Sequence, residues 1–123
     1  MEPHVFVLHG PRPPESPVYP IVLDSPHSGF RAPPDFGAAA SVRELREGED
    51  AFVDELFLPA ARLGIPLLTA QFPRTYIDAN RHTADIDPQL MAEPWPHPTL
   101  DSGKAAIGKA LVWRTLLDGR PIY

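Results

Sequence analysis

Proline restricts this chain more than any other residue does. Seventeen of the 123 residues are proline, about three times the usual share of about 5%. Because proline lacks a backbone N–H and constrains the residue before it, dense prolines interrupt long helices and central strands. Five prolines fall within Gly10–Pro20, which we expect to be extended and irregular. Residues 1–18 are therefore interpreted as a proline-rich N-terminal arm, and residues 19–123 as the folded domain.

Composition and charge exclude several classes of protein. Apolar residues make up 43% of the chain and charged residues 22%, which is typical of one globular domain. The net charge of −5 and the lack of any run of Lys or Arg argue against a nucleic-acid partner, because phosphate binding requires concentrated positive charge. No cysteine is present, so a metal site would need His, Asp or Glu. Without a signal-peptide pattern or an apolar run of about 20 residues, we expect a cytoplasmic protein and no membrane partner.

Two short apolar segments flank a helical pattern. Tyr19–Asp24 predicts a strand that is buried on both faces, and Ile65–Ala70 predicts a second buried strand. Between them, Glu49–Leu63 has the apolar spacing of a helix with one apolar face. Pro59 predicts a kink just before it, and Gly64 is a plausible helix stop. Strand, helix and strand at this spacing indicate a βαβ unit.

The other segments give weaker signals. Ser41 followed by Glu44 predicts a capping box at the start of a short helix. Residues 76–77 are consistent with a third short strand. Residues 82–103 are polar and contain four prolines, and we interpret them as a long surface loop. Residues 104–123 fit either a helix or a strand that ends in a hairpin-like turn.

Residues that can carry chemistry begin where the first predicted strand ends. His27 lies in the sequence Ser-Pro-His-Ser-Gly, at the kind of strand end where ligand sites of α/β sheets gather. A loop histidine among small polar groups can bind a metal through a free ring nitrogen, or can simply form hydrogen bonds. Glu49 and Asp50 follow at the start of the long helical pattern. One of them can join His27 on a metal, but spacing alone favours a simple interaction with the helix dipole.

A denser cluster follows the second predicted strand. Arg74, Asp78, Asn80 and Arg81 occur within eight residues. Two guanidinium groups and an amide suit recognition of a carboxylate through charge-assisted hydrogen bonds. A surface network of ion pairs is the alternative interpretation, and the residues alone do not separate the two.

These elements, in this order, resemble the N-formylglutamate amidohydrolase family. The resemblance rests on four segments, which are Pro20–Gly29, Glu49–Leu56, Phe72–Arg81 and Gly119–Tyr123. The strand followed by Ser-Pro-His-Ser-Gly and the pattern R-x-x-x-D-x-N-R are specific when they occur together. The resemblance extends over nearly all of the chain from about Pro20 onward.

The resemblance implies a fold, a reaction and a cofactor. Family members are similar to metallocarboxypeptidases and aspartoacylases, which implies a phosphorylase/hydrolase-like α/β three-layer sandwich with a mixed central sheet, incomplete in this chain. It implies Zn²⁺-dependent C–N hydrolysis of the linear amide of an N-formyl or other N-acyl amino acid. His27 is then a zinc ligand, together with Glu49 or Asp50, and we favour Asp50.

The resemblance also implies roles for the arginine-rich cluster. Arg74 corresponds to the catalytic arginine that polarises the scissile carbonyl and stabilises its oxyanion. Asn80 and Arg81 correspond to a clamp for the substrate carboxylate, and Asp78 supports them. The small acylamino acid would thus be held by its carboxylate while its amide is attacked.

The same resemblance predicts that the chain represents the N-terminal half of a longer enzyme. The family's later histidine ligand and glutamate base lie beyond the segment that corresponds to this chain, so we expect weak zinc binding and little hydrolysis from a truncated product. One alternative is a noncatalytic module that binds acylamino acids or carboxylates. Another is an interaction protein that oligomerises through an unfinished sheet edge. The partners considered are therefore a second copy of the chain and the missing C-terminal half.

Overall fold

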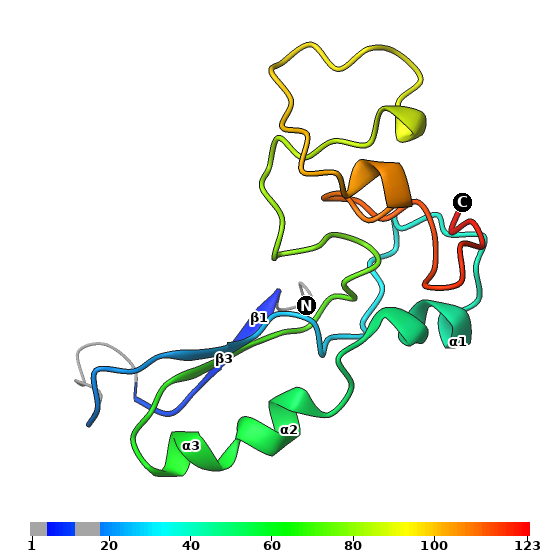
Figure 1. Ribbon diagram of the computed structural model, residues 1–123. Helices are drawn as coiled ribbons and strands as arrows, with labels where there is room; N and C mark the ends of the chain where they lie inside the picture. Colours follow the sequence, from blue (N-terminus) through cyan, green and yellow to red (C-terminus); the bar gives the residue numbers. More distant parts are fainter. Residues whose placement is uncertain (1–4, 12–17) are drawn as a thin grey trace.

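The computed structural model describes residues 5–11 and 18–123, whose three strands form one mixed sheet (Figure 1). Strand β1 spans Phe6–His9, β2 spans Leu23–Ser25 and β3 spans Leu67–Ala70. The central strand β3 runs parallel to β2 and antiparallel to β1. Helices α2 (Val53–Phe57) and α3 (Pro59–Arg62) connect β2 to β3. The predicted α/β class with a mixed sheet is confirmed.

The crossover between the parallel strands is a broken helix. A helical pattern over Glu49–Leu63 with a kink or restart near Leu58 was expected, and the structure has two helices, α2 and α3, that are separated at Leu58. Helix α2 begins later than the pattern predicts, at Val53 and not at Glu49, because Phe52 adopts a left-handed conformation with φ of 65°. Gly64 ends α3 with φ of 81°, as predicted for a helix stop. The predicted βαβ unit is therefore confirmed. Among the described residues, no helix is long and apolar enough to cross a membrane.

The first predicted strand is wrong in its extent and burial. A strand buried on both faces was expected over Tyr19–Asp24, but β2 begins only at Leu23. The preceding Ile21 and Val22 are 46% and 70% exposed. The physical reason is position, because β2 lies at one edge of the sheet order β1-β3-β2 and an edge strand has a neighbour on one side only.

Strand β1 was not predicted. It lies inside the segment interpreted as an N-terminal arm, and it pairs with β3 from Phe6 opposite Ala70 to His9 opposite Leu67. A four-residue apolar stretch next to prolines is too short to be identified as a strand by its pattern. The expected irregular stretch falls largely on residues 12–17, which lie outside the described residues.

The segments after β3 are held mainly by turns. The predicted strand at Tyr76 and Ile77 is wrong, because the Tyr76 N–H closes a turn on the Pro73 carbonyl at 3.0 Å. The long loop over 82–103 is confirmed, with one 3₁₀ turn at Pro88–Leu90.

The last twenty residues are neither a regular helix nor a regular strand. A 3₁₀ turn spans Ala105–Ile107. Two isolated antiparallel bridges follow, between Lys109 and Trp113 and between Thr115 and Pro121. The second bridge closes the hairpin-like turn that the sequence predicts. The local sequence of this segment favours neither a helix nor a strand, so long-range packing decides its conformation.

A compact apolar cluster fastens the C-terminal segment to the first helix. Helix α1 (Val42–Leu45) begins at the predicted capping box, in which Ser41 and Glu44 bond reciprocally, and a 3₁₀ turn follows at Arg46–Gly48. The buried cluster consists of Phe36, Leu45, Trp113, Leu116 and Ile122. It brings Trp113 beside the segments that carry the candidate site residues.

Gly29 generates a first prediction, because it lies where the chain crosses the end of β3. A Cβ atom at this position would lie 2.5 Å from backbone atoms of Gln71 and Phe72 and 2.7 Å from that of Ala70. The crossed backbone cannot yield without disturbing the sheet. We expect Gly29→Ala to lower the free energy of unfolding by about 1–3 kcal/mol, as measured by urea denaturation followed by circular dichroism. Ala92→Ser adds one atom at an exposed loop position and should have little effect, and an equal loss in both variants would contradict the interpretation.

Candidate active site

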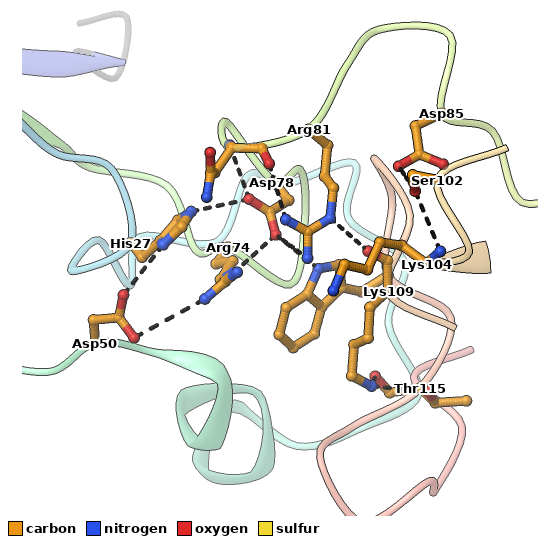
Figure 2. A network of polar contacts seen from close by, with 12 residues as sticks. His27, Asp50, Arg74, Asp78, Arg81, Asp85, Ser102, Lys104, Lys109 and Thr115 are labelled. Atoms are coloured by element: carbon orange, nitrogen blue, oxygen red, sulfur yellow. Dashed lines mark hydrogen bonds and ion pairs between the residues drawn. The ribbon is translucent and has the colours of Figure 1, made fainter. Parts of the chain in front are cut away.

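A buried carboxylate connects three segments that are far apart in the sequence. The Asp78 side chain is 0% exposed, and it receives donors from the loop after β2, from its own turn and from the C-terminal segment (Figure 2). Its contacts are His27 Nε2 at 2.9 Å, Arg74 Nε at 2.8 Å, the Asn80 N–H at 2.9 Å, Trp113 Nε1 at 3.1 Å and Arg81 Nη2 at 3.5 Å. Because a buried carboxylate requires paired charge and hydrogen bonds, this set fixes the three segments relative to one another.

These contacts keep Asp78 ionised. Burial alone would raise the pKa of the carboxyl group, because a low-dielectric interior disfavours charge. The hydrogen bonds from Arg74 and the Asn80 N–H, together with the charges of Arg74 and Arg81, outweigh burial and hold the pKa of Asp78 below its ordinary value. At neutral pH the carboxylate therefore only accepts hydrogen bonds.

His27 lies between two carboxylates. Its Nε2 is 2.9 Å from Asp78 and its Nδ1 is 3.1 Å from Asp50. Because Asp78 only accepts, Nε2 carries a hydrogen, and a neutral ring presents the lone pair of Nδ1 to Asp50. Two acceptors that face each other need a positive species between them, either a proton or a metal ion. The His27 side chain is 7% exposed and that of Asp50 is 52% exposed, so the pair opens to solvent on the Asp50 side.

Serine hydroxyl groups attach the Asp50 segment to the loop that carries His27. Ser28 Oγ donates to the Asp50 carbonyl at 3.0 Å and accepts from the Asp54 N–H at 3.3 Å. Ser25 Oγ lies 2.5 Å from Ser28 Oγ, and the Asp50 N–H donates to the His27 carbonyl at 3.0 Å. The Ser-Pro-His-Ser-Gly sequence therefore fixes the chain just before α2, and its two serines act as structural hydrogen-bonding groups.

Arg74 extends from the buried carboxylate toward the open side of the site. Its Nε donates to Asp78 at 2.8 Å, and its Nη1 lies 4.0 Å from Asp50 Oδ1. The centre of its guanidinium group lies 5.0 Å from the Trp113 ring centroid. This cation–π contact holds the group in place without using its hydrogen-bond donors.

Trp113 and Lys109 are site components that the sequence analysis missed. The Trp113 indole bonds Asp78, and the Lys109 ammonium lies 4.8 Å from the same ring. Lys109 Nζ also donates to the Leu116 carbonyl at 2.7 Å and to Thr115 Oγ1 at 2.9 Å. Burial lowers the pKa of Lys109, and the nearby Arg114 charge acts in the same direction. No local pattern reveals these contacts, because Trp113 and Asp78 are 35 residues apart in sequence.

Of the two residues predicted to clamp a carboxylate, Arg81 forms hydrogen bonds within the chain and Asn80 is exposed. Arg81 Nε donates to the Lys109 carbonyl and Nη1 to the Asn80 carbonyl, both at 2.9 Å. Asn80 is exposed, and its backbone rather than its side chain makes the contact with Asp78. The roles of Asn80 and Arg81 toward a substrate stay predictions. The geometry leaves the Asn80 amide open to solvent.

Asp50, and not Glu49, is the acidic residue in contact with His27. The Glu49 side chain is 3% exposed and pairs with Arg46 at 3.2 Å. Within residues 5–11 and 18–123, no group of three or more His, Cys, Asp or Glu side chains is placed to hold a metal ion. The donors that this part of the chain brings together on the open side are His27 and Asp50.

Replacement of Asp78 tests its structural importance. Asp78→Asn conserves shape but leaves Arg74, Arg81 and His27 without the anion that they surround. We expect the free energy of unfolding at pH 7 to fall by about 3 kcal/mol or more, because removing one partner of a buried ion pair is strongly destabilising. Urea denaturation measures this loss. The exposed Asp24→Asn is the matched control, and a similar small effect of both substitutions would refute the assignment.

The lowered pKa of Asp78 gives a separate prediction for acid. Because its pKa is lower in the folded chain than in the unfolded chain, the unfolded chain binds the proton first as pH falls. The stability contributed by Asp78 is therefore complete above the unfolded pKa and is lost as pH falls from about 5 through the folded pKa. The free energy of unfolding should decline less steeply over this range in Asp78→Asn than in the wild type. If the free energy of unfolding fell with pH equally in the wild type and in Asp78→Asn, the prediction of a lowered pKa for Asp78 would be wrong.

Comparison with known proteins shows which family this chain resembles. A family model described as N-formylglutamate amidohydrolase matches residues 19–123. The crystal structure of N-formylglutamate amidohydrolase from Ralstonia eutropha JMP134 has 45% sequence identity and a TM-score of 0.85, over 96% of this chain and 41% of that chain. The chain thus spans about two fifths of the length of that structure, and no curated protein matches it. Because the family match includes both the His27 loop and the Arg74–Arg81 turn, the chain belongs to the N-formylglutamate amidohydrolase family.

Proposed function

We propose that this chain forms one side of the active site of a zinc-dependent amidohydrolase. The reaction would be hydrolysis of the formyl amide of N-formylglutamate or of a similar N-acyl amino acid, as in the amidohydrolases that the chain resembles. The observation that carries the proposal is the facing pair of His27 Nδ1 and Asp50 Oδ2, 3.1 Å apart. The position of Arg74 beside this pair supports the same reaction.

The chemistry of the two donors fits zinc. Imidazole and carboxylate ligands lie about 2.0–2.2 Å from the ion, so two of them on a tetrahedral ion are about 3.3 Å apart. The observed separation of 3.1 Å is close to that value. The bond from His27 Nε2 to Asp78 also matches the way in which a carboxylate orients a metal-binding histidine. Because a catalytic zinc normally has three protein ligands, we expect His27 and Asp50 alone to bind zinc weakly.

The chain's own residues would act on the substrate from the side opposite the buried carboxylate. Zinc, when bound, supplies a water of lowered pKa and polarises the amide carbonyl. Arg74 would donate to the carbonyl oxygen as negative charge develops there, which stabilises the transition state more than the substrate. Asp78 and Trp113 hold Arg74 before the substrate arrives, so little reorganisation is needed.

The substrate carboxylate would be recognised at the Asn80 end of the site. The exposed amide of Asn80 can donate to a carboxylate oxygen. Arg81, whose Nη2 lies 3.5 Å from Asp78, would contribute positive potential from behind the turn. This contact would orient the acylamino acid so that its amide meets Arg74 and the metal-binding pair.

The complete fold and activity would need more than this chain. The chain covers 41% of the Ralstonia structure, and we propose that the mixed sheet is the middle of a three-layer sandwich in the whole enzyme. Hydrolysis by the chain alone is expected to be slight, so binding measurements are the more decisive tests.

Zinc binding tests the assignment of His27 and Asp50. Titration of the chain with zinc against a chromophoric chelator should show weak binding that His27→Ala and Asp50→Asn each reduce by about tenfold or more, since each removes one of two ligands. Glu49→Gln is the control, because Glu49 pairs with Arg46, and its affinity should equal that of the wild type. Unchanged affinity in His27→Ala would exclude this metal site.

Binding of N-formyl-L-glutamate tests the function itself. Calorimetry in the presence of zinc should detect binding, and formate release should be slow. Arg74→Gln should weaken binding about 10- to 100-fold, because a hydrogen bond to a charged group contributes about 1.5–3 kcal/mol. Arg62→Gln, at an exposed position in α3, should leave affinity unchanged. Equal binding by wild type and Arg74→Gln would refute the role given to Arg74.

A further inference from the structure

Asp50 is held beside His27 through its backbone. Its N–H donates to the His27 carbonyl at 3.0 Å, and its carbonyl accepts from Ser28 Oγ at 3.0 Å. Both backbone groups of one candidate metal ligand are therefore bonded to the other ligand or to the residue that follows it. The Asp50 side chain is 52% exposed, so packing by neighbouring side chains restricts its carboxylate little.

The Ser28 hydroxyl uses its full hydrogen-bonding capacity at this point. A serine hydroxyl has one hydrogen to donate and two lone pairs that accept. The hydrogen goes to the Asp50 carbonyl, and the lone pairs accept from the Asp54 N–H at 3.3 Å and from Ser25 Oγ at 2.5 Å. Because the single hydrogen of Ser28 points to Asp50, Ser25 is the donor in the contact between the two hydroxyl groups. Ser28 is 6% exposed and Ser25 is 1% exposed, so water competes little for these groups.

Ser28 also acts as the cap of helix α2. The N-cap residue of this helix is Phe52, whose side chain has no atom that accepts a hydrogen bond. The Asp54 N–H lies in the first turn, where a helix has no internal acceptor for its N–H groups. Ser28 Oγ accepts from it at 3.3 Å, as the side chain of an N-cap serine does. A residue of the His27 loop therefore caps the helix that follows Asp50.

The backbone between Asp50 and α2 is strained. Within residues 5–11 and 18–123, Phe52 is the one residue other than glycine with a positive φ, of 65°. This conformation is unfavourable for phenylalanine, because its Cβ atom crowds the backbone. Such a residue persists only where surrounding contacts determine it, and residues of this kind gather at binding sites. Here Ser28 supplies contacts on both sides of Phe52, at the Asp50 carbonyl and at the Asp54 N–H.

We propose that Ser28 is a positioning residue of the metal site, whose hydroxyl fixes the backbone around Phe52 and thereby holds the Asp50 carboxylate opposite His27 Nδ1. The assignment rests on the proposed zinc site and adds the group that determines its affinity. Without the hydroxyl, the Asp50 carbonyl and the start of α2 lose their bond to the His27 loop. Zinc then has to order a mobile carboxylate when it binds, and the affinity falls because that ordering opposes binding.

A double-mutant cycle on zinc affinity tests the assignment. Titration against a chromophoric chelator should show that Ser28→Ala weakens zinc binding about tenfold, and no more than Asp50→Asn does. In the Asp50→Asn background, Ser28→Ala should have no further effect, because the ligand through which it acts is absent. Equal weakening in both backgrounds would show that the hydroxyl acts on the whole fold or on His27, and it would overturn the proposal. Ser102→Ala removes a hydroxyl that bonds Asp85 at 2.6 Å, and this control should keep the wild-type affinity.

Phe52→Gly separates positioning from stability. Glycine adopts a positive φ without strain, and the Phe52 side chain is 64% exposed, so this variant should unfold at the same urea concentration as the wild type or at a higher one. It should also bind zinc like the wild type, because Ser28 still holds Asp50. Combined with Ser28→Ala, it should restore stability while zinc binding stays weak. Zinc affinity that returned together with stability would reduce Ser28 to a structural residue and would overturn the proposal.

Amide hydrogen exchange of the zinc-free chain distinguishes failure of this inference from failure of the proposed function. In Ser28→Ala, exchange of the Asp50 and Asp54 N–H groups should accelerate about tenfold more than that of the β3 amides, because the start of α2 opens locally. Unchanged relative rates would overturn the proposal whether or not zinc binds. Local opening in Ser28→Ala, together with no zinc binding by the wild type, would instead contradict the proposed zinc site and leave the positioning of Asp50 by Ser28 supported.

Discussion

The buried carboxylate of Asp78 is the interaction on which the rest of the site depends. Moving a carboxylate from water into a protein interior costs several kcal/mol unless charge and hydrogen bonds compensate. Here compensation comes from elements distant in sequence, namely the loop after β2 through His27 and the C-terminal segment through Trp113. Satisfying this one anion therefore requires the tertiary fold, and the fold in turn fixes the orientation of His27 and Arg74.

The charges of the site are nearly balanced before any ligand binds. Asp50 and Asp78 oppose Arg74 and Arg81, and the contacts between them are 2.8 to 4.0 Å long. These four groups have no excess positive charge to offer an anionic acylamino acid. A divalent cation between His27 and Asp50 would supply it, and Arg74 would become freer to donate to the substrate as its contact with Asp50 weakens. Metal and substrate binding would thus support each other through one carboxylate.

Local rules predicted the local elements well. Ser41 with Glu44 gives the capping box, Pro59 breaks the helix at Leu58, and Gly64 stops it, because each depends on the backbone of a few neighbouring residues. The failures depend on distant contacts. Strand β1 forms only through its pairing with β3. Tyr76 does not adopt strand geometry, because its segment leads directly to Asp78, whose backbone is hydrogen-bonded to the C-terminal residues.

The candidate site shows the same division. The family resemblance pointed to His27, Asp50 and the Arg74–Arg81 cluster, and the geometry brings His27, Asp50, Arg74 and Asp78 together. Spacing could not separate Glu49 from Asp50, since adjacent residues point to different sides and only the tertiary fold shows which one meets His27. It could not find Trp113 either, because an indole that bonds a carboxylate 35 residues away has no local pattern.

The polar groups around Asp78 have hydrogen-bond partners within the chain, whereas several large apolar side chains are exposed to solvent. The Asp78 network has its hydrogen bonds within the chain, while the crossover helices expose Phe52, Leu56 and Leu63. These two features meet at the start of α2, where Ser28 binds the Asp50 segment and Phe52 turns the backbone with φ of 65°. The position of Asp50 therefore depends on the short stretch of backbone between its contact with Ser28 and the turn at Phe52. Because the Asp50 side chain is 52% exposed, the hydrogen bonds of its backbone to the His27 loop, rather than packing around the side chain, determine where its carboxylate meets His27.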